Sequence, residues 1–383
     1  MINLRSKFLL RPDITFLNFG SFGAVPKKVQ EHYHQFQNEF EEDPVDFFVN
    51  RGLAYLHVSR RALANFVVCD DLDLVFVSNP SYAVNTVAKS FPLAHGDEVL
   101  STNIEYGACD RTWDYFCEKA GAIYRRQPIS FPLTSKEDFL EQFWKGLTDR
   151  TKLIFISHIT SSTALKLPVQ EICDHANELG IPVFIDGAHA PGHIDLDLRK
   201  MNPTYYTGAC HKWMMTPRGC SFLYTKKSAQ KDLDPLIISW GYKSLFPSTS
   251  QYQDYHQMNG TRDFTPFLMI PSALDFMKTN NWEAVKSDCK KMVLDNAPRL
   301  NQILGSQPVA PLSDEFTGQM YAAELKTDAP EKFQKMLYDK YKIQIPVIRQ
   351  DDKNYLRYSI QGMNTQEDLE KLFEALEIEM KTT

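Results

Sequence analysis

This sequence has no long hydrophobic run. No segment of its 383 residues approaches the roughly 20 apolar residues that a helix needs to cross a bilayer. The opening residues, MINLRSKFLLRPD, hold only three consecutive apolar residues between charged ones, which is not the pattern of a signal peptide. We therefore expect a protein without a membrane segment or an export signal.

An excess of positive charge is also lacking. The 42 Lys and Arg residues are outnumbered by 48 Asp and Glu residues, which gives a formal net charge of −6. Nucleic acids and anionic membranes attract basic surfaces, so neither is expected as a partner. Seven cysteines, an odd number without regular spacing, predict reduced thiols in a cytoplasmic protein.

What the sequence does contain is a series of short apolar runs that alternate with helical patterns. Its 43% hydrophobic and 23% charged residues are typical of a globular protein long enough for a large and a smaller domain. Alternating strands and helices predict an α/β fold with a three-layer, doubly wound, mostly parallel sheet. The seven predicted strands are 74–78, 99–101, 123–125, 153–157, 183–186, 205–207 and 221–225.

The pattern changes after Ile270, where long helical stretches over 271–304 are followed by shorter strand-like runs. We predict a large domain over 20–265. A small α+β domain is predicted from 1–19 together with 266–383. Its strand-like runs are 320–325, 343–348 and 355–360, and its last helix begins near Thr365.

Two polar groups follow strands near the middle of the chain. Asp186 ends the apolar run Ile181–Ile185, and His211 and Lys212 follow the predicted strand at 205–207. Open α/β sheets bind ligands at the carboxyl edge of their strands, where these side chains should meet. An Asp that holds a pyridinium nitrogen and a Lys that forms an imine can bind opposite ends of one planar cofactor.

A metal site is an alternative for the same stretch. Asp186, His189 and His193 have the spacing D-x2-H-x3-H, and carboxylates and imidazoles are metal ligands that would suit a metal-dependent hydrolase. Pro191 lies between the two histidines and prevents the regular helix that would align them. A non-catalytic protein that keeps the fold for regulation or assembly is a third alternative.

The ordered set of motifs resembles a known family. DGAHAPGHIDLDL and the later ACHKW are similar to the fold-type-I pyridoxal phosphate enzymes of aminotransferase class V. Three further segments, LNFGSFGAVP, EYGACDRTW and SHITSSTALKLPV, resemble its isopenicillin N epimerase-like branch. The resemblance extends over nearly the whole chain, and it implies a transferase-like α/β fold with pyridoxal 5′-phosphate as the cofactor.

The resemblance also implies roles for individual residues around that cofactor. Lys212 would hold it covalently, and Asp186 would pair with its ring nitrogen. The helix that begins after the turn at Ser78–Pro80 has unpaired N–H groups that can bind the phosphate. The alternative is that this turn serves only as the N-cap of the helix. The remaining cofactor-binding candidates are Ser81, Tyr82, Tyr106, Ser161, His189, Thr207, His211, and Gly260 and Thr261 from a neighbouring subunit.

The substrate implied by the resemblance is an amino acid. Arg357, in YLRYSIQGMNT, matches the position that binds the α-carboxylate, and a guanidinium binds carboxylates through two parallel hydrogen bonds. Asn18 and Ser21, in the glycine-containing loop near the N-terminus, are further substrate-binding candidates. The family also implies a homodimer with active sites at the interface.

The reaction type stays open between several classes. Epimerisation needs proton delivery to both faces of Cα, with Lys212 on one face and Tyr106 as the candidate on the other. A C–S lyase needs one base and a leaving group, and an aminotransferase needs a second substrate. A desulfurase of the persulfide type is disfavoured, because the last cysteine is Cys289 and none lies between Gln344 and Arg357.

Overall fold

Alternate residues of the central strands face two separate hydrophobic cores. In the computed structural model, which describes residues 3–245 and 247–381, Val75 and Val77 pack into one core. Their neighbours Leu74 and Phe76 pack into the other. Because side chains of a strand alternate between its two faces, a strand that is apolar throughout must be covered on both sides. The result is the three-layer arrangement that the sequence predicts.

The central sheet has seven strands in the order β2-β8-β7-β6-β5-β3-β4. Neighbouring strands from β7 to β4 pair in parallel, whereas β8 is antiparallel to both of its neighbours. All the predicted strands are present, so the predicted fold class is confirmed. The strands are β2 (Leu74–Val77), β3 (Glu98–Thr102), β4 (Ile123–Gln127), β5 (Thr151–Ser157), β6 (Val183–Gly187), β7 (Tyr205–Ala209) and β8 (Ser221–Thr225).

Helices cover both faces of this sheet. Trp113 of α6 and Val84 of α5 belong to one core, and Ile172 of α8 and Phe139 of α7 belong to the other. Most of these helices connect one strand to the next parallel strand, as βα units require. They are α5 (Pro80–Ser90), α6 (Gly107–Ala120), α7 (Lys136–Trp144), α8 (Val169–Glu178) and α9 (Leu198–Met201).

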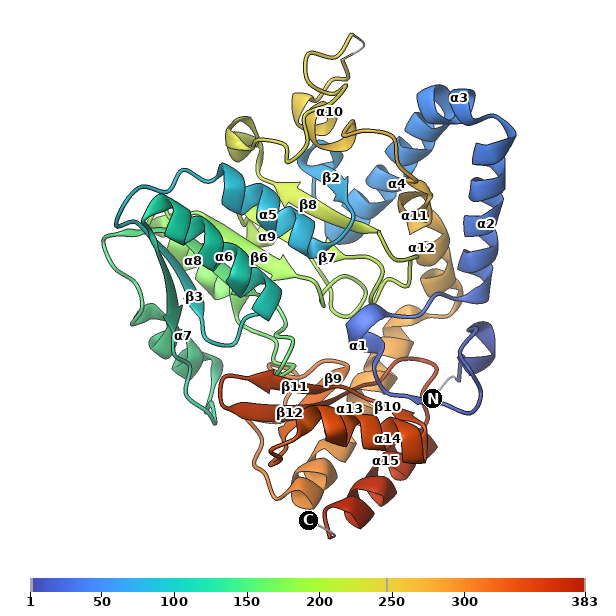
Figure 1. The fold of residues 1–383 in the computed structure, drawn as a ribbon, viewed down its shortest axis with the longest axis vertical. Helices are drawn as coiled ribbons and strands as arrows, with labels where there is room; N and C mark the ends of the chain where they lie inside the picture. The colour runs from blue at the N-terminus through green and yellow to red at the C-terminus, as the bar shows by residue number, and fades with distance from the viewer. Residues whose placement is uncertain (1–2, 246, 382–383) are drawn as a thin grey trace.

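A group of helices from the N-terminal part of the chain and from around residue 270 stands beside the sheet (Figure 1). The helices α2 (Lys27–Glu42) and α4 (Gly52–Val67) pack against α11 (Thr265–Leu268) and α12 (Ile270–Thr279). The aromatic segment between α2 and α4 forms α3 (Pro44–Asp46) and a turn of π-helix over Phe47–Arg51. Short helices at Phe19–Phe22 (α1) and Gln251–Gln257 (α10) complete this part.

The remaining chain forms what we call the C-terminal unit, residues 282–381, below the sheet in Figure 1. Helix α13 (Trp282–Leu304) packs on an antiparallel sheet of order β11-β12-β9. The N-terminal strand β1 (Thr15–Phe16) pairs with β10 (Ile343–Gln344) of this unit. The other elements are β9 (Met320–Glu324), α14 (Pro330–Tyr341), β11 (Val347–Gln350), β12 (Lys353–Ser359) and α15 (Gln366–Glu379).

Two predicted elements of the C-terminal region are divided in the structure. The long helical stretch over 271–304 breaks between α12 and α13, where Asn281 adopts a left-handed conformation with φ of 49°. The strand predicted over 343–348 is split into β10 and β11 at Pro346, which has no N–H group for a sheet hydrogen bond. Neither break changes which helices and strands pack together.

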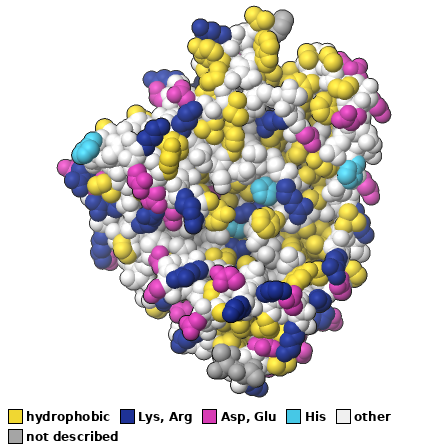
Figure 2. All heavy atoms as spheres, viewed as in Figure 1, with side chains coloured by type: hydrophobic (Ala, Val, Ile, Leu, Met, Phe, Trp, Pro, Cys, Tyr) yellow, Lys and Arg dark blue, Asp and Glu magenta, His cyan; other side chains and the backbone are white. Residues whose placement is uncertain are grey.

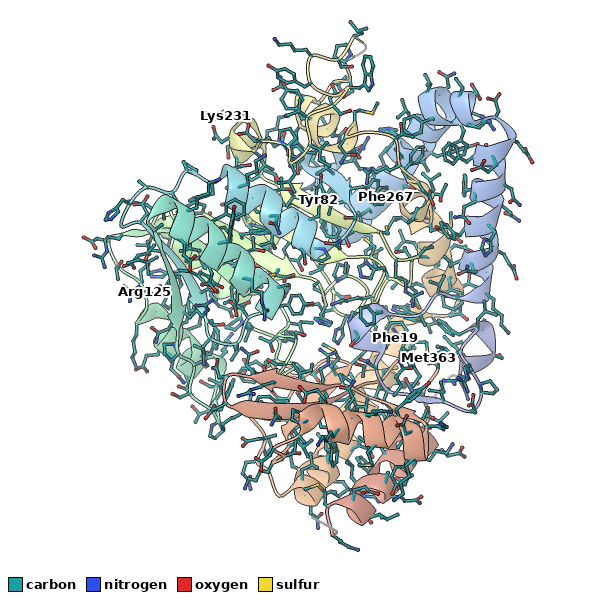
Figure 3. The ribbon with its side chains drawn as sticks, viewed as in Figure 1. Phe19, Tyr82, Arg125, Lys231, Phe267 and Met363 are labelled. Atoms are coloured by element: carbon teal, nitrogen blue, oxygen red, sulfur yellow. The ribbon has the colours of Figure 1, made fainter. Side chains whose placement is uncertain are left out.

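The N-terminal loop joins the two parts of the molecule. Figure 3 shows Phe19 between the large sheet and the C-terminal unit, where its ring lies 5.3 Å from that of Trp213. Gly23 has a positive φ of 63°, and a side chain there would meet the backbone oxygen of His211. Gly23 thus lets the N-terminal loop pack closely against the turn that carries Lys212. Among the described residues, none of the helices is both long and apolar enough to cross a membrane.

Candidate active site

A cavity of about 190 Å³ opens at the carboxyl ends of the parallel strands β5 and β6. It receives side chains from both strands, from the loops that follow β6 and β7, and from the first turns of α5 and α6. The structure therefore brings together segments that are far apart in the sequence. The lining residues are Ser21, Phe22, Asn79, Pro80, Ser81, Tyr106, Cys109, Ser157, Ile159, Ser161, Asp186, Ala188, His189, His211 and Lys212.

Asp186 lies at the end of β6 and is buried, with 4% of its surface exposed. One carboxylate oxygen accepts the N–H of Ala188 at 2.9 Å, and the other accepts the thiol of Cys109 at 3.4 Å. Burial raises the pKa of Asp186, although the Ala188 N–H and the charge of Lys212 oppose this. A buried carboxylate with such weak partners suits a cationic N–H group of a ligand.

Lys212 reaches the same cavity from the turn after β7. Its Nζ lies 3.3 Å from Nε2 of His189. Burial lowers the pKa of Lys212 to about 8, the charge of Arg357 acts in the same direction, and Asp186 opposes it. A much larger fraction of this amine is therefore neutral near pH 7 than for an ordinary lysine, as a nucleophilic amine requires.

His189 is held in one tautomer by a tryptophan. The indole Nε1–H of Trp213 donates to His189 Nδ1 at 3.3 Å. Because an indole nitrogen only donates, Nδ1 must carry the lone pair, and the proton of the neutral ring is on Nε2. Burial, with the nearby charges of Lys212 and Arg357, holds the pKa of His189 well below its ordinary value. His189 thus points an N–H group at the position of Lys212.

Arg357 is a buried cation that has no anionic partner among the described residues. Only 1% of it is exposed, on strand β12, and burial lowers its pKa to about 10. Its Nη1 donates to the carbonyl oxygen of Ser161 at 2.5 Å and to the Ser161 hydroxyl at 3.3 Å, and Nη2 donates to the Ser21 hydroxyl at 3.4 Å. Its Nε has no hydrogen-bond partner within the described chain. An unpaired buried charge is costly, so a site for an anion is the natural reason for it.

The substrate-binding candidates near the N-terminus meet this arginine. The Ser21 hydroxyl that receives Arg357 Nη2 itself donates to Asn18 Oδ1 at 2.5 Å. Asn18, Ser21 and Arg357 thus form one connected set, although they come from opposite ends of the chain. The carbonyl oxygen and hydroxyl of Ser161 hold the other side of the guanidinium, which leaves its position well defined.

The start of α5 and the side chain of His211 lie at another wall of the cavity. Asn79 caps the helix by accepting the N–H of Tyr82 at 2.9 Å, and Ser81 lines the cavity beside it. His211 Nδ1 lies 3.1 Å from the carbonyl oxygen of Cys220, so Nδ1 carries the proton and Nε2 is available. Burial lowers the pKa of His211 to about 4, and a bound anion would raise it again.

Tyr106 stands at the mouth of the cavity, with 49% of its surface exposed. The neighbouring Glu105 is buried and accepts the N–H and hydroxyl of Ser157 at 2.9 and 2.5 Å. It also accepts the Thr102 hydroxyl at 2.7 Å, and burial raises the pKa of Glu105 to about 8. These bonds attach the turn that carries Tyr106 to the end of β5.

Four predicted cofactor-binding residues are not among those that line this cavity. The Thr207 hydroxyl donates to the carbonyl oxygen of Phe222 at 2.8 Å, within the sheet. The Tyr82 hydroxyl lies 3.4 Å from Nδ2 of Asn259. Gly260 and Thr261 are exposed and line a different cavity, of about 260 Å³. Within one chain, the structure does not bring these side chains to Lys212.

Cys109 and Trp213 are residues of the site that the sequence analysis missed. Cys109 lies three positions after Tyr106 at the start of α6, and this helical spacing was the available signal that both face one side. Trp213 directly follows Lys212, but an apolar residue beside a reactive lysine is equally expected of a core position. The partners of both became visible only in three dimensions.

The alternative of a metal-dependent hydrolase is wrong. His193 Nδ1 lies 3.0 Å from the carbonyl oxygen of His189, and His193 Nε2 accepts the N–H of Gln319 at 2.5 Å, so neither nitrogen is available to a metal. No group of three His, Cys, Asp or Glu side chains is placed to hold a metal within residues 3–245 and 247–381. His158 pairs with the Tyr206 hydroxyl at 3.0 Å, and burial lowers the pKa of His158 to about 3.

The donor set of the cavity fits pyridoxal phosphate. A buried carboxylate, an amine of lowered pKa and the N–H groups at the start of α5 are separate groups around one cavity. They match the ring nitrogen, aldehyde and phosphate of that molecule. His189 supplies an N–H group near the amine, where the phenolic oxygen of the ring requires a donor. These side chains and N–H groups together account for each polar part of pyridoxal phosphate.

Comparison with known proteins agrees with this fit. The family model described as Aminotransferase class-V matches residues 23–372. The isopenicillin N epimerase of Amycolatopsis lactamdurans is 33% identical, over 98% of this chain and 97% of the relative. Putative L-cysteine desulfhydrase 1 of Oryza sativa subsp. japonica is 28% identical, over 94% of this chain and 82% of the relative. A structure of C-DES, a cystine C–S lyase, with glycine linked to its pyridoxal phosphate has the same fold. It is 19% identical, with a TM-score of 0.82 over 97% of this chain and 98% of that chain.

We predict that the amine of Lys212 reacts with pyridoxal phosphate with a pH midpoint near the lowered pKa of about 8. The rate at which cofactor-free protein gains a visible absorbance band should rise with pH through that midpoint, since only the neutral amine attacks an aldehyde. Arg357→Gln removes a nearby positive charge and should move the midpoint up. Asp186→Asn removes the negative charge and should move it down.

The Lys212→Ala variant supplies the background for this measurement, because any remaining band then comes from other lysines. A wild-type midpoint at the ordinary lysine value of 10.5, unaffected by either substitution, would contradict the electrostatic description of the cavity.

Proposed function

The chain belongs to the aminotransferase class-V family, its cofactor is pyridoxal 5′-phosphate, and we propose that it epimerises an α-amino acid at Cα. The observation that carries the proposal is the buried Arg357 guanidinium, which has no acidic partner among the described residues and lies close enough to Lys212 to lower its pKa. A cation that needs a carboxylate, beside an amine that needs an aldehyde, suits a substrate with both an amino and a carboxylate group. The 33% identity to an isopenicillin N epimerase supports epimerisation as the reaction.

The residues at the deep end of the cavity bind and orient the cofactor. When bound, pyridoxal phosphate supplies an aldehyde that takes amines and a ring that withdraws electrons from Cα. Asp186 accepts the ring N–H and keeps that nitrogen protonated. His189 Nε2–H donates to the phenolic oxygen, and the first turn of α5 with His211 binds the phosphate.

Arg357 orients the substrate. Its guanidinium binds the α-carboxylate through two parallel hydrogen bonds, and Ser161 and Ser21 prevent it from rotating. A carboxylate bound at this point keeps Cα near Lys212, so the substrate can react in only one orientation.

Lys212 and Tyr106 move the protons. Lys212 takes the proton from Cα on its own face, and its pKa of about 8 lets it both accept and return a proton near neutral pH. Tyr106, at the mouth of the cavity, is the donor for the opposite face. Inversion at Cα requires this second donor, because a single lysine that returns its proton to the same face regenerates the original enantiomer.

A C–S lyase is a second candidate, and two observations favour it. The cavity of about 190 Å³ has room for little beyond the cofactor and a small side chain. The Tyr106 phenol is half-exposed at the mouth of the cavity, so water rather than the enclosed groups of the site surrounds much of it. Elimination needs only Lys212 and a leaving group, and relatives that include a putative desulfhydrase are 28% identical.

Product analysis distinguishes the two reactions. With a panel of L-amino acids, an epimerase forms the D-enantiomer and incorporates solvent deuterium at Cα, whereas a lyase releases sulfide, ammonia and a 2-oxo acid. Arg357→Gln should lower kcat/KM by about 100-fold, because it removes the charged partner of the carboxylate. For amines that lack the carboxylate, the same substitution should lower kcat/KM only slightly.

The variant Tyr106→Phe separates the roles further, since it should stop epimerisation and leave elimination intact. An unchanged kcat/KM in Arg357→Gln, or a larger effect on the amines than on the amino acids, would contradict the proposed substrate class.

The exposed surface near Gly260 and Thr261 suits a second copy of this chain. Ile238, Trp240 and Leu245 are 63%, 75% and 78% exposed, which is unusual for large apolar side chains in a monomer. Figure 2 shows hydrophobic side chains gathered at the end of the molecule where α10 lies. We propose a homodimer in which Gly260 and Thr261 of one subunit reach the phosphate site of the other.

A mixing experiment tests the shared site. Thr261→Ala should weaken cofactor binding, whereas Lys212→Ala abolishes the visible band. A heterodimer of the two variants contains one site in which both residues are intact, so mixing should restore a band of normal affinity in half of the heterodimer sites, which are a quarter of all sites in a random mixture. If Thr261 served its own subunit instead, mixing would restore nothing. A double variant, Trp240→Glu with Leu245→Glu, should be monomeric by light scattering.

A further inference from the structure

His193 links the C-terminal unit to the active site through both of its ring nitrogens. It is 3% exposed, and its Nε2 accepts the backbone N–H of Gln319 at 2.5 Å. A backbone nitrogen only donates, so Nε2 must carry the lone pair. The proton of the neutral ring is therefore on Nδ1, which donates to the carbonyl oxygen of His189 at 3.0 Å. Burial lowers the pKa of His193 to about 3, in agreement with a neutral ring.

The same imidazole supports Trp213 by stacking. The ring centroids of His193 and Trp213 are 4.1 Å apart, and the planes are inclined by 27°. Trp213 in turn donates its N–H to His189 Nδ1 at 3.3 Å. His193 therefore holds the backbone of His189 directly and its side chain through Trp213. The Nε2–H group of His189 faces Lys212 as a consequence of both contacts.

On its other side, His193 contacts the sheet that carries Arg357. Gln319 immediately precedes β9, in which Ala322 pairs with Arg357 of β12. Gln319 is also bonded to Ile360 twice, at 2.8 Å through its carbonyl oxygen and at 3.1 Å through its side-chain amide. A side chain at Gly318 would lie 2.3 Å from His193 Nε2, so only glycine leaves room for this approach. The peptide that binds His193 and the guanidinium of Arg357 thus belong to one rigid sheet.

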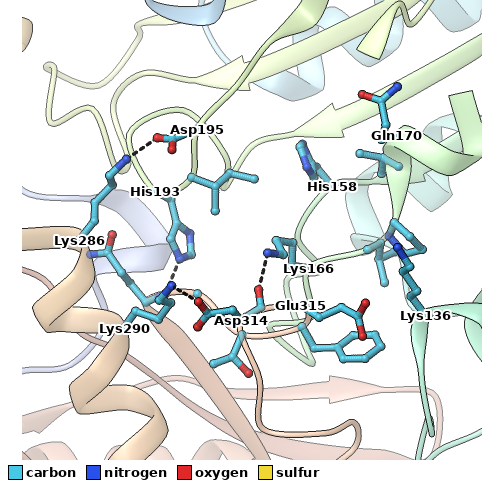
Figure 4. A pocket seen from close by; sticks show the side chains of 18 of the residues that line it. Lys136, His158, Lys166, Gln170, His193, Asp195, Lys286, Lys290, Asp314 and Glu315 are labelled. Carbon is cyan, nitrogen blue, oxygen red and sulfur yellow. Dashed lines mark hydrogen bonds and ion pairs between the residues drawn. The ribbon is translucent and has the colours of Figure 1, made fainter. Parts of the chain in front are cut away.

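Apolar packing joins the two parts of the molecule elsewhere, since residues of both belong to one hydrophobic core. A cavity of about 710 Å³ lies directly behind His193, between the large sheet and the C-terminal unit. Figure 4 shows His158 and His193 on its walls together with Lys290, Asp314 and Glu315. Individual polar contacts bridge it, such as Lys286 with Asp195 at 2.5 Å and the Lys166 amine with the Asp314 carbonyl oxygen at 2.5 Å.

We propose that His193 is a positioning residue that couples the location of the Arg357-bearing sheet to the orientation of His189 and Trp213 beside Lys212. The coupling deepens the proposed function and rests on it, because Arg357 is where the substrate carboxylate binds. Because Gln319 and Arg357 belong to one sheet, a displacement of that sheet would displace His193 as well. The N–H group of His189 is therefore held against Lys212 when Arg357 is in the position that binds the substrate.

The variants follow from the geometry of the two bonds. His193→Phe keeps a ring against Trp213 and removes both hydrogen bonds. His193→Asn keeps a donor near the position of Nδ1 and should restore the bond to His189. Gly318→Ala displaces His193 from the side of the C-terminal unit without altering a residue of the site. His158→Phe is the matched control, since His158 is another buried histidine on the wall of the same cavity but pairs with Tyr206.

The first measurement needs no cofactor. In cofactor-free protein labelled with ¹⁵N-histidine, long-range ¹H–¹⁵N correlation should show His193 protonated at Nδ1 and His189 protonated at Nε2. His193→Phe and Gly318→Ala should disturb the His189 signals, and His158→Phe should leave them unchanged. A His189 spectrum that is insensitive to both substitutions overturns the proposal, whatever reaction the protein catalyses.

The second measurement is the pH midpoint at which Lys212 of cofactor-free protein reacts with pyridoxal phosphate. The His189 N–H favours the neutral amine, so its loss in His193→Phe should raise the midpoint by about half a pH unit. Gly318→Ala should give a similar rise, and the two shifts should not add in the double variant, because both act through one contact. His193→Asn should return the midpoint toward the wild-type value, and His158→Phe should not move it.

Additive shifts from His193→Phe and Gly318→Ala, or equal shifts from the His158→Phe control, overturn the coupling. If the wild-type protein forms no visible band with pyridoxal phosphate, the proposed function fails, and the histidine spectra still decide the role of His193.

Discussion

Three charged side chains held out of water at one edge of the sheet are the constraint on which the rest of the site depends. Asp186 and Arg357 are almost fully buried, and Arg357 has no acidic partner in the part of the chain that the structure describes. Folding around such groups is costly unless a ligand supplies the missing charges. The same burial lowers the pKa of Lys212 to about 8, so the arrangement that disfavours isolated charges also activates this amine. A molecule with a cationic ring nitrogen, an aldehyde and an anionic phosphate relieves one part of this cost, and a substrate carboxylate relieves the other.

Much of this arrangement was predictable from the sequence, because it depends on local signals. Most strands of the sheet are short apolar runs of the expected length, although β4 (Ile123–Gln127) reads IYRRQ. Asp186 and Lys212 follow two of them, so the topology of a parallel sheet alone indicates that they meet. Arg357 was identified by a motif rather than by burial, and only the structure reveals that it is enclosed. The breaks at Asn281 and Pro346 shifted boundaries and left the architecture intact.

What the sequence could not indicate are contacts between residues with no fixed spacing. Trp213 fixes the tautomer of His189, and a backbone N–H group from the C-terminal unit fixes that of His193. The D-x2-H-x3-H spacing suggested metal ligands because a sequence pattern gives the residue types but not their hydrogen-bond partners. The structure shows that both ring nitrogens of His193 are hydrogen-bonded, so this histidine supports the loop after β6 instead of binding a metal. Thr207 is a similar case, since its hydroxyl is used within the sheet and is not offered to a ligand.

The most direct test of this account is to locate the covalent attachment of the cofactor. Protein loaded with pyridoxal phosphate is reduced with borohydride and digested, and the peptides are analysed by mass spectrometry. The account predicts a single phosphopyridoxyl group on the peptide that contains Lys212, with loss of the visible band in proportion. A reduced adduct spread over exposed lysines, with Lys212 unmodified at full loading, would contradict the assignment of the cavity and the chemistry proposed for it.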